Sequence, residues 1–290
     1  MLTKIGNVYI DHDHCPKIMG IINTSPESFY KGSIKLNSKE IQNTVLEMQR
    51  YGANIIDIGG MSTAPYLKTL IPVELEIERL KNAISIIRQI SDIPISIDSV
   101  RSNVLKALLS YDINAINDIS GLKYDKEMPV VVSESKLPVI IGASRIFSNS
   151  YLTTGDIYDT INILSESIKS AKMFGIDHDK IIIDPSIGFF RRNDISSFTS
   201  KINGLDWYIR DIDIISNIRL IKSLDHPICI SISRKSFIGS LFELSEDERL
   251  IPSIIAEIHC ILNGVSLIRT HNVKETRLAM NMISVINSSS

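Results

Sequence analysis

The sequence has few cysteines, little net charge and no long hydrophobic run, and each of these absences excludes a class of protein. Three cysteines in 290 residues are too few, and odd in number, for a disulfide framework, which favours a reducing compartment. No apolar stretch approaches the ~18 residues of a membrane span. The segment 1–15 also lacks the apolar core of a signal peptide. We therefore expect a soluble cytoplasmic protein that does not bind membranes.

The net charge of −2 gives no electrostatic reason to expect nucleic acid as a partner. Hydrophobic residues make up 44% of the chain, which is enough for a sizeable core. The length suits one large α/β barrel or two average domains, but no linker, low-complexity tract or change of composition marks a boundary. We expect a single domain over residues 1–290, with 1–16 as an N-terminal lead-in and 287–290 as a frayed tail.

Short runs rich in Ile and Val alternate with amphipathic stretches along the whole chain. In 73–90 apolar residues recur at steps of four and three, which is typical of a helix with one buried face. Similar patterns predict helices over 38–51, 101–110, 157–174 and 272–286. Ser38 and Asn272 are the expected N-caps of the first and last of these. The apolar runs predicted to be strands are 17–22, 54–58, 94–98, 115–117, 137–142, 180–184, 227–232 and 265–269.

These eight runs are apolar throughout, which indicates parallel strands that are buried on both faces. Because a helix-like stretch follows each run, the pattern predicts an α/β fold, a single (β/α)8 TIM barrel. A doubly wound open sheet is the alternative. In a barrel the C-terminal ends of the strands meet at one face, where active sites lie.

Polar side chains stand where the predicted strands end. The exits of the first six strands provide mainly acids and amides, among them Asn23, Asp57, Asp98, Asn117 and Asp184. The exits of the last two provide the cations Arg234, Lys235, Arg269 and His271. Acids and amides suit a flat heterocycle that carries several N–H groups, whereas guanidinium groups fit phosphate oxygens. The residues alone therefore predict a polar aromatic ligand at one end of the site and a phosphorylated group at the other.

Seven motifs then identify a family. In chain order they are "MGIINTSPESF" (19–29), "IDIGGMSTAP" (56–65), "SIDS" (96–99), "INDISG" (116–121), "DPSIGF" (184–189), "SRKSFIG" (233–239) and "IRTHNV" (268–273). With these motifs the sequence resembles dihydropteroate synthase from Ile18 to Val273. The resemblance implies a barrel enzyme, typically a homodimer, that joins 7,8-dihydropterin-6-ylmethyl diphosphate to p-aminobenzoate. It also implies that diphosphate leaves first with the help of Mg²⁺, and that the aryl amine captures the resulting pterin-methyl cation on the way to folate.

The resemblance further implies a role for each residue of the site. Asn23 resembles the asparagine at the diphosphate and Mg²⁺, while Arg269 and His271 resemble the diphosphate clamp. The residues that resemble the pterin-binding set are Asp98, Asn117, Asp184 and Lys235. Those that resemble the acceptor-binding set are Ser62, Thr63, Pro65, Phe189 and Ser236, with Ser236 near the acceptor's carboxylate. The catalytic residues implied are Lys235, Arg269 and His271.

The acceptor end departs from the family pattern at three places. "GGMSTAP" replaces "GESTRP", so Met61 and Ala64 stand for Glu and for an Arg that normally helps the acceptor loop to close. "DPSIGFFRR" replaces "DPGIGFGK", and "GASRIFSN" replaces the usual motif after the fifth strand. A larger arylamine derived from p-aminobenzoate, as in a methanopterin-type cofactor, is therefore a second candidate acceptor. Its phosphate would bind one of the additional cations, Arg145, Arg191 and Arg192.

Two other functions remain open at this point. A methyl-transfer enzyme of the related pterin-binding barrels would keep the pterin-binding Asp and Asn, but it would not need "SRKS" or the Arg269 and His271 clamp. A non-catalytic pterin-binding protein would keep the pterin end and lose the acceptor end.

Overall fold

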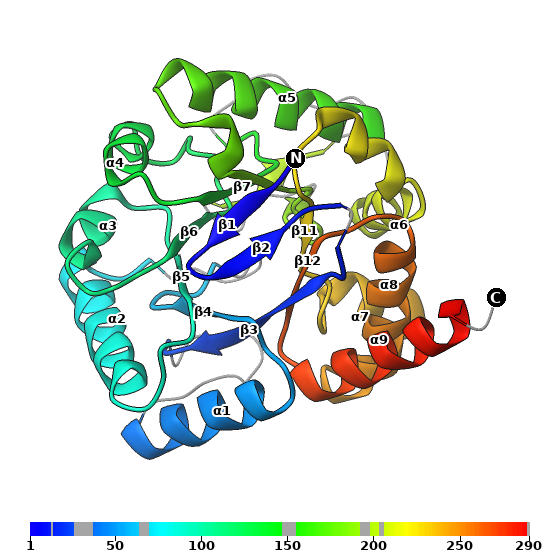
Figure 1. The fold of residues 1–290 in the computed structure, drawn as a ribbon. Coiled ribbons are helices and arrows are strands. Elements are labelled where there is room, and N and C mark those ends of the chain that lie inside the picture. Colours follow the sequence, from blue (N-terminus) through cyan, green and yellow to red (C-terminus); the bar gives the residue numbers. More distant parts are fainter. Residues whose placement is uncertain are drawn as a thin grey trace.

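The computed structural model describes residues 1–12, 14–25, 37–63, 70–146, 155–191, 198–202 and 206–288. At its centre is an eight-stranded sheet in the order β11–β12–β3–β4–β5–β6–β7–β8, and every adjacent pair in it is parallel (Figure 1). The first and last strands also meet, because Ile183 bridges Ile228 and its N–H donates to Pro227 O at 3.0 Å. The sheet thus closes on itself. The predicted TIM barrel is confirmed, and the open doubly wound sheet is excluded.

The strands of the barrel agree with the apolar runs of the sequence. They are β3 (Lys17–Asn23), β4 (Ile55–Gly59), β5 (Ile95–Asp98), β6 (Ala115–Asp118), β7 (Val139–Gly142), β8 (Ile181–Asp184), β11 (Cys229–Ile230) and β12 (Leu267–Thr270). Every one of them begins and ends within two residues of the prediction, although β11 keeps only two residues of the predicted 227–232. Continuous apolar runs predicted these strands because both of their faces are buried, one by the barrel interior and one by the helices.

A ring of helices surrounds the strands (Figure 1). They are α1 (Ser38–Arg50), α2 (Val73–Arg88), α3 (Ser102–Leu108), α4 (Met128–Ser135), α5 (Ile157–Met173), α6 (Trp207–Ser216), α7 (Ser236–Phe242), α8 (Leu250–Leu262) and α9 (Val273–Ser288). Helix α9 includes two of the residues predicted as a frayed tail, and 289–290 lie outside the described residues. No helix in the described part of the chain is long and apolar enough to cross a membrane.

The two predicted helix caps have different outcomes. Ser38 is not the N-cap of α1, because Asn37 precedes it and accepts a hydrogen bond from Glu40 N at 2.9 Å. Asn and Ser are similarly good caps, so the spacing to the helix N–H groups decides between adjacent candidates. Asn272 does precede α9, but its Oδ1 accepts from Arg234 Nε at 3.0 Å.

A β-hairpin that the sequence did not predict covers the N-terminal ends of the barrel strands (Figure 1). Its strands are β1 (Thr3–Ile5) and β2 (Val8–Ile10), and they pair antiparallel. Ile5 and Ile10 are fully buried and pack with inward-facing residues of the barrel, such as Met19 and Ile140. The segment expected to be a lead-in is therefore part of the core, and it closes the barrel at the face opposite the strand exits.

Candidate active site

Strand register gathers three of the predicted residues in one row at the C-terminal mouth of the barrel. Asn23 lies beside Gly59, Gly59 beside Asp98, and Asp98 beside Asn117. Gly59 lets Asn23 and Asp98 approach each other closely, since a Cβ at Gly59 would lie only 3.2 Å from Asn23 Oδ1 and 3.9 Å from Asp98 Oδ2. The amide oxygen of Asn23 and the carboxylate of Asp98 therefore lie on either side of Gly59. Asp184 ends β8 at the same mouth.

Arg269, on β12, joins two acids of the mouth. Its Nε donates to Asp57 Oδ2 at 2.6 Å and its Nη2 donates to Asp98 Oδ2 at 2.7 Å. Asn117 Nδ2 donates to the same oxygen of Asp57 at 3.1 Å. Burial alone would lower the pKa of Arg269, but the carboxylates of Asp57 and Asp98 raise it above its ordinary value. Asp57 is fully buried, and its strand-end position alone predicted no specific role for it; in the structure it holds Arg269 and Asn117 in place.

Both acids that bind Arg269 keep a second oxygen for another donor. Asp57 Oδ1 and Asp98 Oδ1 are buried and have no hydrogen-bond partner among the described residues. A buried polar atom without a partner costs about 1–3 kcal/mol, so a ligand that donates N–H groups here would recover that energy. Burial raises the pKa of Asp98 to about 7, although Arg269 opposes the rise. A cationic or N–H-rich ligand at this site would favour the carboxylate.

Lys235 lies along the loop that follows β8. A Cβ on Gly188, whose φ is +86°, would lie 3.0 Å from Lys235 Cδ, so only glycine lets the lysine pass so close. Lys235 Nζ is 4.2 Å from the centroid of the Phe189 ring. Burial lowers the pKa of Lys235 to about 8, helped by Arg269 and opposed by Asp184. Burial raises the pKa of Asp184, while the N–H of Ser186, 2.7 Å from Oδ1, and the charge of Lys235 oppose the rise.

His271 lies directly after β12, and its backbone N–H donates to Ser233 Oγ at 3.3 Å. Burial lowers the pKa of His271 well below its usual value, and the neighbouring cations Arg269, Lys235 and Arg234 lower it further. Without a ligand the imidazole is therefore neutral at pH 7. A polyanion bound among these cations would offset their positive charge and favour the imidazolium.

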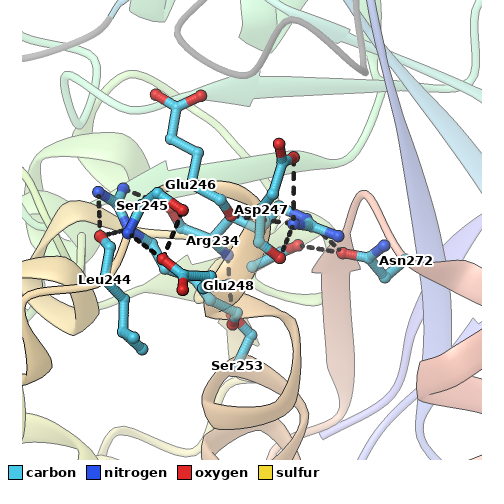
Figure 2. A network of polar contacts seen from close by, with 10 residues as sticks. Arg234, Leu244, Ser245, Glu246, Asp247, Glu248, Ser253 and Asn272 are labelled. Atoms are coloured by element: carbon cyan, nitrogen blue, oxygen red, sulfur yellow. Dashed lines mark hydrogen bonds and ion pairs between the residues drawn. The ribbon is translucent and has the colours of Figure 1, made fainter.

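Arg234 connects the loop after β11 to Glu246, Asp247 and Asn272, as Figure 2 shows. Its Nη1 donates to Glu246 O at 2.9 Å and to Asp247 O at 3.1 Å, and its Nε donates to Asn272 Oδ1 at 3.0 Å. The sequence grouped Arg234 with cations at a phosphate-binding position. In the structure these donors bind the chain itself, so Arg234 fixes the geometry of the loops after β11 and β12.

The predicted acceptor residues are placed only in part. Ser62 is buried and Thr63 half-buried after β4, whereas Ala64 and Pro65 lie outside the described residues. Ser236 begins α7, and Phe189 is half-buried beside Lys235.

The additional cations have different environments. Arg191 is buried; its Nη2 donates to Ser236 Oγ at 2.8 Å and its guanidinium carbon lies 3.7 Å from the centroid of the Trp207 ring. Arg145 forms an ion pair with Glu166 at 3.3 Å, and Glu166 is largely exposed. Arg192 lies outside the described residues. Of the arginines considered for an acceptor anion, Arg191 thus contacts a predicted acceptor residue.

The structure explains why position 61 carries a methionine where the family pattern has a glutamate. Met61 belongs to a small buried cluster with Val100 and Phe198, against which Ile71 and Tyr124 pack. The cluster joins both ends of the acceptor loop, at Met61 and Ile71, to the segment that follows β9 (Phe190–Arg191). A glutamate at this position would place a charge among apolar side chains, whereas methionine fills the space.

The fold and the site define a (β/α)8-barrel protein whose mouth combines acids and amides with a group of cations. A model of the family described as pterin binding enzyme matches residues 19–271. The dihydropteroate synthase of Clostridium beijerinckii is 33% identical over 285 residues, 98% of each chain. That of Synechocystis sp. is 30% identical over 275 residues, 93% of this chain and 90% of the relative.

A solved structure supports the same assignment. A dihydropteroate synthase from Coxiella burnetii in complex with pteroic acid is 29% identical, with a TM-score of 0.83 and full coverage of both chains. The chain therefore belongs to the dihydropteroate synthase family of pterin-binding enzymes, and the resemblance inferred from the motifs is confirmed.

Proposed function

We propose that the protein joins a 7,8-dihydropterin-6-ylmethyl diphosphate to p-aminobenzoate, or to an arylamine derived from it, and releases diphosphate. The observation that carries this proposal is the pair of buried oxygens, Asp57 Oδ1 and Asp98 Oδ1, beside a group of cations at one barrel mouth. Both substrates are small molecules. The pterin diphosphate combines the same two features, an N–H-rich ring and a polyanion. The relatives that carry the name dihydropteroate synthase support this reaction.

The pterin would bind at the acidic side of the mouth. Its ring N–H and amino groups would donate to Asp98 and Asp184, and Asn117 can both donate and accept. Lys235 would lie against the ring, because its chain is held along Gly188 and Phe189. The hydrogen bond from Asn117 to Asp57 fixes the amide so that its oxygen remains available to a ligand.

The cations would stabilise the leaving group. When the methylene C–O bond breaks, its electron pair goes to diphosphate, and the growing negative charge meets Arg269 and His271. Such fixed charges act in the transition state at little cost of reorganisation. Two donors of Arg269 bind acids, but its Nη1 makes only a long contact of 3.5 Å with Ser231 Oγ, so the N–H groups of Nη1 could donate to a phosphate oxygen. The amine nitrogen then bonds to the methylene carbon and loses a proton.

We propose that Mg²⁺ is bound chiefly by the substrate. In the part of the chain that the structure describes, no group of three or more His, Cys, Asp or Glu side chains could hold a metal ion. Mg²⁺ commonly takes one or two protein oxygens, substrate phosphates and water, and the amide oxygen of Asn23 at the end of β3 fits that demand. When bound, the ion would supply positive charge to the leaving diphosphate.

We propose that the acceptor's carboxylate binds near Ser236, with Arg191 as the cation. The bond from Arg191 Nη2 to Ser236 Oγ brings a guanidinium to this end of the site, and the Trp207 ring limits its movement. A short p-aminobenzoate could reach this pair. A longer, phosphorylated arylamine would need a further cation such as Arg145, whose guanidinium already pairs with Glu166.

The decisive experiment is a diphosphate-release assay with the pterin diphosphate, p-aminobenzoate and Mg²⁺. We expect release that depends on both substrates and stops when Mg²⁺ is chelated. Pterin binding without release from any arylamine would instead indicate a non-catalytic binding protein. Methyl transfer from a methylated pterin would indicate the related methyltransferases. A comparison of kcat/KM for p-aminobenzoate and a phosphorylated arylamine would identify the acceptor.

We also propose that two copies associate through the outer faces of α8 and α9. Seven large apolar side chains on these packed helices are at least 48% exposed: Ile251, Ile255, Leu262, Leu278, Met282, Val285 and Ile286. An apolar surface of this kind marks an interaction site. Light scattering should give twice the chain mass, and Ile255→Asp should give the monomer. The matched control, Tyr158→Asp on α5, should stay dimeric; a monomeric wild-type protein would refute the proposal.

We place the enzyme in the cytoplasm, where its substrates would be made. All three cysteines are free thiols, and Cys15 is exposed, which suits a reducing compartment.

A further inference from the structure

Helix α6 carries a buried ion pair that no step of the reaction above uses. Arg210 and Asp211 are adjacent in the sequence, both side chains are fully buried, and Arg210 Nη1 lies 3.0 Å from Asp211 Oδ1. Removing two charges from water is costly unless further hydrogen bonds compensate. The groups that supply those hydrogen bonds therefore show what the pair does.

The pair binds the backbone of the loop between β8 and β9. Arg210 donates from Nη2 to Pro185 O at 2.9 Å and from Nη1 to Ser186 O at 3.3 Å. Asp211 Oδ1 accepts from Gly188 N at 3.1 Å. Two neighbouring side chains on one helix thus hold three peptide groups of a four-residue stretch.

This loop has a conformation that needs support. Ser186 has a φ of +55°, which a residue with a side chain rarely adopts, and Gly188 has a φ of +86°. Arg210 is itself fixed from the other side, because Nη2 donates to Thr160 Oγ1 at 3.0 Å and the guanidinium carbon lies 3.9 Å from the Phe190 ring centroid. The arginine therefore connects the loop to both α5 and α6.

The supported loop sets the position of two pterin-site residues. Ser186 N donates to Asp184 Oδ1 at 2.7 Å, so a shift of Ser186 would turn the carboxylate of Asp184. Gly188 packs against the chain of Lys235, so a shift of Gly188 would move the ammonium group. Two of the three loop residues that the ion pair holds, Ser186 and Gly188, are thus in contact with a site residue.

The two charges of the pair also act on the pKa values of Asp184 and Lys235. Burial raises the pKa of Asp184, and the cation of Arg210 is among the charges that oppose this rise. Burial lowers the pKa of Lys235, and the anion of Asp211 is among the charges that oppose this fall. The pair therefore favours the carboxylate at one position and the ammonium at the other.

We propose that Arg210 and Asp211 are positioning residues for pterin recognition, which hold the loop after β8 so that Asp184 and Lys235 face one ligand. The proposal rests on the proposed function, because it takes Asp184 and Lys235 as pterin-binding residues. Neither Arg210 nor Asp211 touches the reacting atoms, and both act through the loop.

Calorimetric titration with a pterin that lacks diphosphate tests the proposal in three variants, each at a temperature well below its unfolding midpoint. Arg210→Lys keeps the charge but cannot span Pro185 O, Ser186 O and Thr160 Oγ1 together. We expect its pterin affinity to fall by about tenfold or more, because a lysine leaves buried carbonyls unpaired. Asp211→Asn keeps an acceptor for Gly188 N and removes the charge, so the alkaline limit of pterin binding should move to lower pH as the pKa of Lys235 falls.

Arg88→Lys is the matched control. Arg88, on α2, donates to the backbone oxygens of Ile93 and Asp112, both at 2.7 Å, near the opposite end of the barrel. It should lower stability and leave pterin affinity unchanged. A folded Arg210→Lys with affinity within about twofold of wild type, or an equal loss in Arg88→Lys, would overturn the proposal.

Two remaining outcomes are also decisive. If Arg210→Lys does not fold, Asp211→Asn carries the test, and an unchanged pH profile of binding refutes the proposal. If the wild-type protein itself does not bind pterin, the proposed function fails instead, so the two failures are distinguishable.

Discussion

Replacing Glu257 by glutamine should change the pH dependence of stability in a predictable direction. Glu257, on α8, is fully buried; its Oε2 accepts from Thr276 Oγ1 at 2.7 Å, and its Oε1 has no partner among the described residues. Burial raises the pKa of Glu257 from 4.5 to about 7, although the hydroxyl groups of Thr276 and Thr270 oppose the rise. The folded protein therefore prefers the protonated side chain.

The sign and size of the effect follow from this pKa. A group with a raised folded pKa contributes stability below its unfolded pKa, and that contribution is lost as pH rises through the folded pKa. The window therefore runs from pH 4.5 to about 7. At 1.36 kcal/mol per pKa unit the loss amounts to roughly 3 kcal/mol. Glutamine cannot ionise. At pH 8 the free energy of unfolding of Glu257→Gln should therefore exceed that of wild type by up to about 3 kcal/mol.

Urea unfolding of both proteins at pH 5 and pH 8 measures this difference. Comparing the two proteins at each pH cancels other titrating groups, such as His226, whose pKa burial lowers to about 4. At pH 5 the variant should be equal to wild type or slightly less stable, because its amide N–H₂ needs a partner that Oε1 did not have. A stability difference that is the same at both pH values would refute the reasoning.

Three further predictions concern the site. Asp98→Asn and Asp184→Asn should each weaken pterin binding by about 1–3 kcal/mol in calorimetric titration, because an amide can turn a donor toward the ring N–H groups; unchanged affinity in both would remove the pterin assignment. Diphosphate binding at pH 7 should take up a proton, because His271 is neutral without ligand, and titrations in buffers of different ionisation enthalpy should detect the uptake in wild type and not in His271→Asn. Arg191→Ala should raise the KM for p-aminobenzoate by about tenfold and leave pterin affinity unchanged; an equal loss of pterin affinity would show that Arg191 only supports the loop.

The sequence by itself determined the strands and the chemistry of their ends. Continuous Ile-rich runs predicted strands buried on both faces, and those runs became the barrel. Because parallel strands end at one face, residues such as Asn23, Asp98 and Asn117 could be assigned to one site without coordinates. The structure places them in one row. Their individual roles stay predictions.

The N-terminal hairpin escaped the sequence analysis because its strands have only three residues each. A period of two cannot be recognised over so short a run, and the segment becomes ordered by packing against the barrel floor. A local pattern also failed to predict the role of Arg234, whose position among other cations predicted a phosphate site. Its hydrogen bonds to Glu246 O and Asp247 O depend on a fold around it that no local pattern describes.

Only the tertiary structure decided which charges meet. Arg269 lies 212 residues from Asp57 and 171 from Asp98 along the chain, and barrel closure brings all three within hydrogen-bond distance. No sequence motif marks Arg210 and Asp211, yet they hold the loop beside the proposed pterin site. Hydrophobic periodicity is a local property that the sequence displays directly. The pairing of buried charges depends on register and closure, which arise only when distant segments pack together.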